Sequence, residues 1–160
     1  MTNLKDMGKI DLLCIGEQKF RSLKELEKDY IKKIGFFSGF SVKNLKEVKI
    51  KDEKIQMERE GKAILEKLSP GDHVIALDRR GKEMDSLKFA NYLSDKISYS
   101  NKKLVFIIGG QMGLSGEVLK RSDLTLSFSK MTFAHDIFKI IFLEQLYRAF
   151  SIIKGTKYHR

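Results

Sequence analysis

Two segments combine glycine with sulfur, hydroxyl and basic side chains, and they are the strongest candidates for ligand chemistry. The first begins with Gly109 and Gly110, directly after the apolar run 104–108 (LVFII). The second, 128–135 (FSKMTFAH), follows a shorter apolar run at 124–128. Glycine permits positive φ angles and close approach of a ligand to the backbone. If both runs are strands of one parallel sheet, the loops after them lie at its carboxyl edge, where ligands usually bind.

The glycine motif alone leaves two interpretations open, a ligand pocket and a tight strand-to-helix turn. GGQMGL (109–114) lacks the GxGxxG spacing of dinucleotide-binding loops and the closing Gly-Lys-Ser/Thr of phosphate-binding loops. The motif therefore belongs to neither of these nucleotide-binding classes.

A third group of reactive side chains lies near the carboxyl end. Glu144 and Arg148 stand four residues apart in a mostly apolar segment, so they can pair on one helix face. The sequence closes with Tyr158, His159 and Arg160. Aromatic rings stack on bases and arginine stabilises anions, which gives the tail a function if it folds back onto a site. The alternatives are a helix-stabilising ion pair and a disordered terminus.

Hydrophobic periodicity predicts an α/β fold in which five helices alternate with five strands of a parallel sheet. The predicted strands span residues 9–16, 42–50, 73–78, 104–108 and 124–128. The predicted helices span residues 20–34, 52–68, 85–98, 115–121 and 136–154, and Gly155 is the expected terminator of the last one.

Three cations follow the third predicted strand, in the segment Arg79-Arg80-Gly81-Lys82. We expect this segment to be a loop, and its cations to lie where they can contact a phosphate backbone. An exposed basic loop without a specific role is an equally good interpretation.

Composition narrows the class of protein. The 160 residues suit a single domain over 1–160, and the formal net charge of +10 favours polyanionic partners such as nucleic acid. The single cysteine, Cys14, is expected in the core of a protein from a reducing compartment. His73, His135 and His159 are too dispersed for a metal site. No apolar stretch is long enough for a signal or a membrane span, so we expect a soluble, cytoplasmic protein.

The last predicted helix is apolar on nearly all sides. A helix of this kind must be buried on more than one face. In a chain of this size a second copy can supply the additional surface, and we therefore predict a homodimer through this helix.

Four segments stand in an order typical of one family: FIIGGQMGL (106–114), RSDLTLSFSKMTFAH (121–135), EQLYRAF (144–150) and GTKYH (155–159). In these motifs the chain resembles the bacterial ribosomal RNA large subunit methyltransferase H family, over nearly its whole length. The resemblance implies a SPOUT-type α/β fold, a mostly parallel sheet flanked by helices with a carboxyl-terminal trefoil knot. It also implies a homodimer that uses S-adenosylmethionine to methylate N3 of a pseudouridine in large-subunit (23S) ribosomal RNA, within assembled ribosomes.

The same resemblance assigns roles to individual residues. The cofactor pocket would be formed by Leu77, Gly109, Phe128, Ser129, Lys130, Met131, Thr132 and Phe133. Among the catalytic candidates, His159 and Glu144 would accept the proton, Arg148 and Arg160 would stabilise the uridine anion, and Tyr158 would position the base. The tail of one subunit would complete the site of the other, and no metal takes part.

Two positions differ from the family pattern. Ala134 stands where proline is usual, which would loosen the cofactor loop. Lys139 stands where arginine is usual, and it lacks the planar two-pronged donor that suits phosphate or base recognition. Two other functions stay open: a non-catalytic RNA-binding protein of the same fold, and a knotted transfer RNA methyltransferase.

Overall fold

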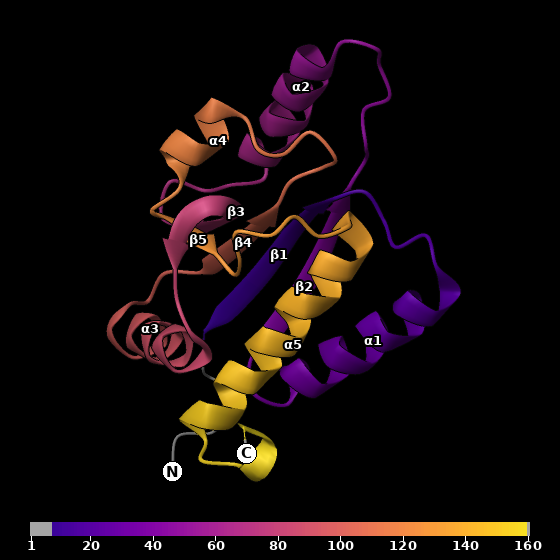
Figure 1. The fold of residues 1–160 in the computed structure, drawn as a ribbon. Helices are drawn as coiled ribbons and strands as arrows, with labels where there is room; N and C mark the ends of the chain where they lie inside the picture. The colour runs from indigo at the N-terminus through magenta and orange to yellow at the C-terminus, as the bar shows by residue number, and fades with distance from the viewer. Residues whose placement is uncertain (1–7, 160) are drawn as a thin grey trace.

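A five-stranded parallel sheet organises the residues that this computed structural model describes, 8–159 without the side chain of His159 (Figure 1). The strand order is β2-β1-β4-β3-β5, and every neighbouring pair is parallel. The predicted α/β class is therefore confirmed. The strands are β1 (Lys9–Ile15), β2 (Gly39–Leu45), β3 (His73–Glu83), β4 (Leu104–Ile108) and β5 (Leu124–Ser127).

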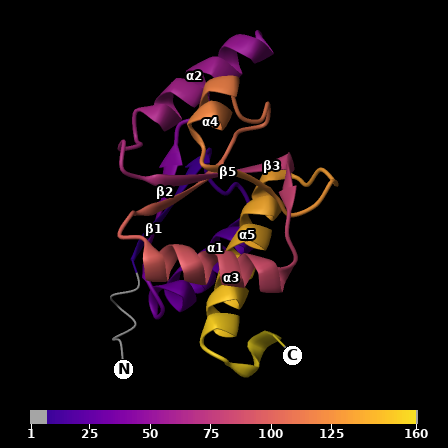
Figure 2. The same cartoon turned by 90° about the vertical axis from the view of Figure 1, so that its left-hand side faces the viewer.

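Helices cover both faces of the sheet, as Figure 2 shows edge-on. α2 (Glu53–Leu65) and α4 (Gly116–Arg121) lie on one face and pack on a smaller core cluster with Ile64 and Val118 at its centre. α1, α3 and α5 lie on the other face and enclose the larger cluster. The remaining bounds are α1 (Arg21–Gly35), α3 (Ser86–Tyr99), α5 (His135–Ile153) and the 3-10 turn η2 (Lys157–His159).

Three helices begin where a short polar side chain can cap them. The side chains of Asp52, Asp85 and Ser115 accept a hydrogen bond from the backbone N–H three residues further on, at the starts of α2, α3 and α4. Such caps satisfy N–H groups that have no partner within the helix. At the other end of the chain, Gly155 adopts φ +68° and ends α5, as predicted.

The predicted bounds of the second strand, 42–50, are wrong at both ends. Gly39 pairs with Lys9 and begins β2. Beyond Leu45 the chain leaves the sheet, because the Val48 N–H donates to the Glu60 carboxylate on α2 at 3.0 Å instead of to a strand. β2 is a half-exposed strand at the edge of the sheet.

The predicted basic loop after the third strand is also wrong, since Arg79, Arg80, Gly81 and Lys82 lie inside β3. Between Leu77 and Lys82 the register with β5 shifts, and the residues between them form a bulge. The bulge passes so close to β5 that a Cβ on Gly81 would lie 2.5 Å from the Thr125 carbonyl oxygen. Two arginines and a glycine interrupt the apolar pattern after Asp78, so hydrophobic periodicity did not predict that the strand continues.

Much of the apolar surface of α5 is buried within one chain, because α1 and α3 pack along it on the sheet (Figure 1). Its buried residues include a charged one, Lys139, which is only 1% exposed. The Lys139 ammonium contacts Glu27 Oε1 on α1 at 2.7 Å and donates to Asn44 Oδ1 on β2 at 2.9 Å. A residue held in the interior in this way ties three elements together, and its ammonium is not at the surface.

Lys139→Met should therefore destabilise the protein strongly. It leaves the Glu27 carboxylate buried without its cation, and breaking such a pair costs about 3–5 kcal/mol. Urea unfolding measures the loss. The double variant Lys139→Met/Glu27→Gln should recover most of it, and a double variant as unstable as the single one would contradict the pairing argument.

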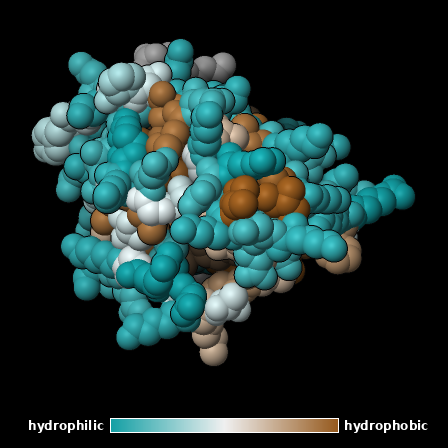
Figure 3. All heavy atoms as spheres, turned by 90° about the horizontal axis from the view of Figure 1, so that it is seen from above, coloured by the Kyte–Doolittle hydropathy of each residue, from teal (hydrophilic) through white to brown (hydrophobic). Residues whose placement is uncertain are grey.

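The face seen from above in Figure 3 is mostly hydrophilic, with small apolar areas between the polar residues. This face therefore offers little continuous apolar surface for a partner. Within the described part of the chain, no helix is both long and apolar enough to cross a membrane.

Candidate active site

A cleft of about 830 Å³ opens at the carboxyl edge of the sheet. Its walls come from all five strands or the segments that follow them: residues 15–17, 19 and 20 at and after the end of β1, Glu47 after β2, 77–80 within β3, 108–114 at and after the end of β4, and 128, 129 and 131–138 after β5. The loops after β4 and β5, which were predicted to meet at one edge of the sheet, line this cleft together. The segment after β1 was missed, although Gly16 directly after a buried strand carries the same signal as Gly109.

The glycine loop of residues 109–113 is tightly folded against itself. The Gly113 N–H donates to the Gly110 carbonyl oxygen at 3.0 Å, and Gly113 adopts φ +83°. A Cβ on Gly109 would lie 2.8 Å from the Gly113 carbonyl oxygen and 2.9 Å from Leu114 Cδ2. A Cβ on Gly110 would lie 2.6 Å from Glu60 Oε2. Glycine is therefore required at both positions by close contacts behind the cleft wall.

The segment after β5 presents aromatic and polar groups to the cleft. Phe128 is anchored on the core by ring contacts with Phe89 and Phe138, and the Ser129 hydroxyl accepts from the Met131 N–H at 3.0 Å. The Met131 side chain is 73% exposed and lines the cleft. Thr132, Phe133 and the buried Leu77 line it as well.

Lys130 is the exception among the predicted pocket residues. It does not line the cleft, and its ammonium lies 3.9 Å from the Glu83 carboxylate on the outside of β3. Ala134, at the end of the segment, has φ −57°. This value lies within the range that a proline ring imposes, so the alanine adopts the backbone conformation that proline would fix.

Two opposite charges at the cleft wall neutralise each other in an ion pair on β3. Arg80 donates from Nε and Nη2 to the two carboxylate oxygens of Asp78, each at 2.9 Å. This hydrogen bonding lowers the pKa of Asp78, which therefore stays ionised at neutral pH. Arg79 also lines the cleft and is exposed.

Cys14 lies beneath the cleft, where its Sγ is 3.6 Å from His135 Nε2. Burial raises the pKa of the Cys14 thiol to about 12. The nucleophilic thiolate is therefore scarce at physiological pH, and the predicted role as a core residue is confirmed.

Cys14 should consequently resist thiol reagents in the folded protein. At pH 8 we expect no labelling by a maleimide over the time in which a free thiol reacts completely, and full labelling in urea. Rapid labelling of the folded chain would show that the thiol is accessible or activated.

The carboxyl-terminal candidates form a separate cluster around Glu144. Arg148 donates to Glu144 Oε1 from Nε at 3.0 Å and from Nη2 at 2.7 Å, and the Tyr158 hydroxyl donates to the same oxygen at 3.2 Å. The Arg148 guanidinium lies 4.9 Å from the centroid of the Tyr158 ring, and Tyr147 packs edge-on against that ring. Partial burial and the Glu144 charge raise the pKa of Tyr158, so its hydroxyl keeps its proton.

This cluster lies away from the cleft of its own chain. α5 begins at the cleft with His135, and Glu144 follows about 13 Å further along the helix axis. One chain thus brings together Glu144, Arg148 and Tyr158 but does not bring them to the predicted cofactor residues. The side chain of His159 and all of Arg160 lie outside the described residues.

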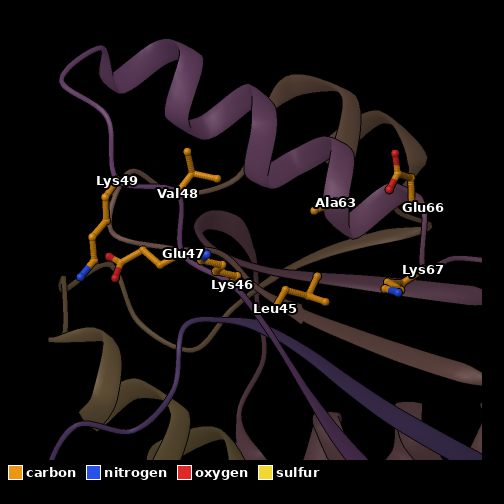
Figure 4. A pocket seen from close by; sticks show the side chains of 8 residues that line it. All are labelled: Leu45, Lys46, Glu47, Val48, Lys49, Ala63, Glu66 and Lys67. Carbon is orange, nitrogen blue, oxygen red and sulfur yellow. The ribbon is translucent and has the colours of Figure 1, made fainter.

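A smaller groove of about 470 Å³ adjoins the cleft and shares Glu47 with it. Figure 4 shows how the segment after β2 runs beside α2, with Val48 pointing toward the helix and Glu47 away from it. Leu45 and Ala63 form apolar parts of this groove, with Lys46, Lys49, Glu66 and Lys67 also on its walls. Among residues 8–158, no three His, Cys, Asp or Glu side chains are grouped as a metal site requires.

Two solved structures with a similar fold are described as a probable and a putative methyltransferase. The chain superimposes on a probable methyltransferase from Bordetella pertussis with a TM-score of 0.60 and 13% identity, over 91% of this chain and 98% of the other. A putative methyltransferase from Legionella pneumophila, solved with bound SAM, gives a TM-score of 0.50 and 14% identity over 89% and 66% of the two chains. At such identities the likeness concerns the fold.

Sequence relatives are much closer. The family described as "Predicted SPOUT methyltransferase" matches residues 8–159. The chain is 41% identical to the ribosomal RNA large subunit methyltransferase H of Carboxydothermus hydrogenoformans, covering 94% of this chain and 99% of the relative. Its identity to the protein of the same name from Bacteroides thetaiotaomicron is also 41%, over 94% and 98%. The chain therefore belongs to the SPOUT methyltransferases and, among them, to the ribosomal RNA large subunit methyltransferase H family.

Proposed function

We propose that this protein is an S-adenosylmethionine-dependent methyltransferase that acts in the cytoplasm on N3 of a pseudouridine in large-subunit ribosomal RNA, within the assembled ribosome. The observation that carries the proposal is the glycine-lined cleft at the carboxyl edge of the sheet, in a chain whose relatives are named for this class of reaction. A single domain over residues 1–160 and a trefoil knot near the carboxyl end belong to the same proposal.

The residues around the cleft suit this cofactor. Leu77, Phe128 and Phe133 offer apolar surface for the adenine and the thioether, and the backbone of the glycine loop offers hydrogen-bonding groups for the ribose and carboxylate. Gly109, Ser129, Met131 and Thr132 complete the predicted set, with Lys130 at its outer edge. The cofactor, when bound, supplies a methyl group on a sulfonium that is already a good leaving group. The protein then has to align the RNA base with that methyl and exclude water.

A homodimer would bring the two parts of the site together. The Glu144 cluster lies too far along α5 to reach the cleft of its own chain, so we assign it to the cleft of a second copy. There Tyr158 would position the base, Arg148 and Arg160 would stabilise its anion, and His159 or Glu144 would accept the N3 proton. In this chain Glu144 Oε1 already accepts from Arg148 and Tyr158, so a proton transfer to it requires that these contacts rearrange.

The net charge of +10 and exposed cations at the cleft, such as Arg79, favour binding to the phosphate backbone of RNA. Arg80 is held by Asp78. Of the β3 arginines, we therefore assign the phosphate contact to Arg79.

The decisive experiment incubates the protein and labelled S-adenosylmethionine with ribosomes from a strain that lacks the enzyme, followed by digestion and mass spectrometry of the nucleosides. We expect N3-methylpseudouridine from the large-subunit RNA, and more of it from whole ribosomes than from free RNA. Label in transfer RNA would indicate a knotted transfer RNA methyltransferase. Absence of cofactor binding at millimolar concentration would leave a non-catalytic RNA-binding protein.

A further inference from the structure

Glu60 is a buried carboxylate with one oxygen that lacks a partner. Its residue is 1% exposed, and its Oε1 accepts from the Val48 N–H at 3.0 Å and from Gln56 Nε2 at 3.3 Å. Its Oε2 is buried and has no hydrogen-bond partner within the described residues. No basic side chain of residues 8–158 forms an ion pair with it. A buried charge in this state is costly, so a group that compensates it is expected in the working protein.

The unpartnered oxygen lies directly behind the cleft wall. A Cβ on Gly110 would be 2.6 Å from Glu60 Oε2 and 3.0 Å from Ile15 Cγ2, and Gly110 and Ile15 both line the cleft. The Glu60 carboxylate therefore lies against the backbone of a residue that lines the cleft. The segment with Val48 runs beside α2 (Figure 4), and the Val48 N–H donates to the other carboxylate oxygen of Glu60 at 3.0 Å.

The other acidic groups at the cleft differ from Glu60 in their surroundings. Asp136 lines the cleft directly and is half-buried, with its carboxylate 3.7 Å from His135 Nδ1. Asp78 is paired with Arg80, and Glu17 is exposed to solvent, where water and salt weaken its field. Glu47 is half-buried at the junction with the smaller groove. The negative charge of Glu60 acts through protein, so its effect on a charge in the cleft is larger than that of an exposed carboxylate.

We propose that Glu60 is a specificity-determining residue that favours the positively charged methyl donor over its neutral product. This inference rests on the proposed function. S-adenosylmethionine carries a sulfonium cation, whereas S-adenosylhomocysteine carries an uncharged thioether in its place. The attraction from Glu60 therefore stabilises the donor complex and is lost when the methyl group leaves, which aids release of the product.

Calorimetric titration with both ligands tests this inference. Glu60→Gln removes the charge, has nearly the same shape and keeps an oxygen for the Val48 N–H. We expect it to weaken binding of S-adenosylmethionine roughly tenfold and binding of S-adenosylhomocysteine by less than about twofold. The control is Glu58→Gln, which removes a charge from the exposed side of the same helix and should change neither affinity.

Glu60→Asp provides a second variant, which keeps the charge but withdraws it from Gly110. It should reduce the preference for the donor by a smaller factor than Glu60→Gln does, and it tests the inference if the glutamine variant does not fold. Equal losses for both ligands, or no loss, would show that Glu60 only shapes the glycine loop and would overturn the inference while the proposed function stands. A wild-type protein that binds neither ligand would overturn both.

Discussion

Gly109→Val is expected to weaken binding of S-adenosylmethionine by roughly 100-fold or more, equivalent to about 2.7 kcal/mol. The effect comes from the loop itself. A Cβ at this position would lie 2.8 Å from the Gly113 carbonyl oxygen and 2.9 Å from Leu114 Cδ2, so the glycine loop must open before any valine fits. Valine would therefore displace the wall of the pocket and would not simply fill it. Calorimetric titration of the purified variant measures the loss.

Gly71→Val is the matched control for this change. Gly71 lies in the turn before β3, away from the cleft, and nothing lies within 4 Å of a Cβ built on it. It should bind the cofactor like the wild type. Thermal unfolding of both variants separates a local distortion of the loop from a general loss of structure. Normal cofactor affinity in Gly109→Val would remove the glycine loop from the site.

Deletion of residues 158–160 is expected to leave cofactor affinity unchanged and to reduce methyl transfer by roughly 100-fold or more, the scale of a lost acid–base or positioning group. The structural reason is the separation of the two groups of residues. Tyr158 contacts Glu144, Arg148 and Tyr147 at the far end of α5, while the cleft lies at its start. Single-turnover methylation of ribosomes, together with cofactor titration, measures the two effects independently.

Tyr158→Phe refines this test, because it keeps the ring beside Arg148 and removes only the hydroxyl that donates to Glu144 at 3.2 Å. It should retain more activity than the deletion. Analytical ultracentrifugation of each variant establishes whether the oligomeric state changes as well. Unchanged turnover after the deletion would mean that the tail takes no part in the reaction.

The cleft was predictable because strand ends in a parallel sheet share one edge. All five residues of β4 are buried, as its continuous apolar run indicated, and the loops after β4 and β5 meet as expected. The ion pair of Glu144 with Arg148 followed from their spacing of four on a helix. Each of these predictions used only short-range periodicity and one general rule of sheet topology.

Other features depend on contacts between distant segments, which periodicity does not contain. Lys139 and Glu60 look like the polar positions of two helices, and only the fold places them in the interior, beside Glu27 and Gly110. The second strand was predicted to begin too late, at residue 42, because a glycine such as Gly39 can begin an edge strand as readily as it can break a helix. The cluster around Tyr158 and the cleft were both identified by resemblance, but their separation within one chain became visible only in the structure.

The placement of α5 has a consequence for communication across the protein. One continuous rod of 19 residues carries His135 at the cleft and ends beside the turn that holds Tyr158. Lys139, in the second turn of α5, contacts Glu27 on α1 and Asn44 on β2. These contacts fix the helix to its neighbours at this point. If binding in the cleft tilts α5 about this point, the end of the helix beside Tyr158 moves with it.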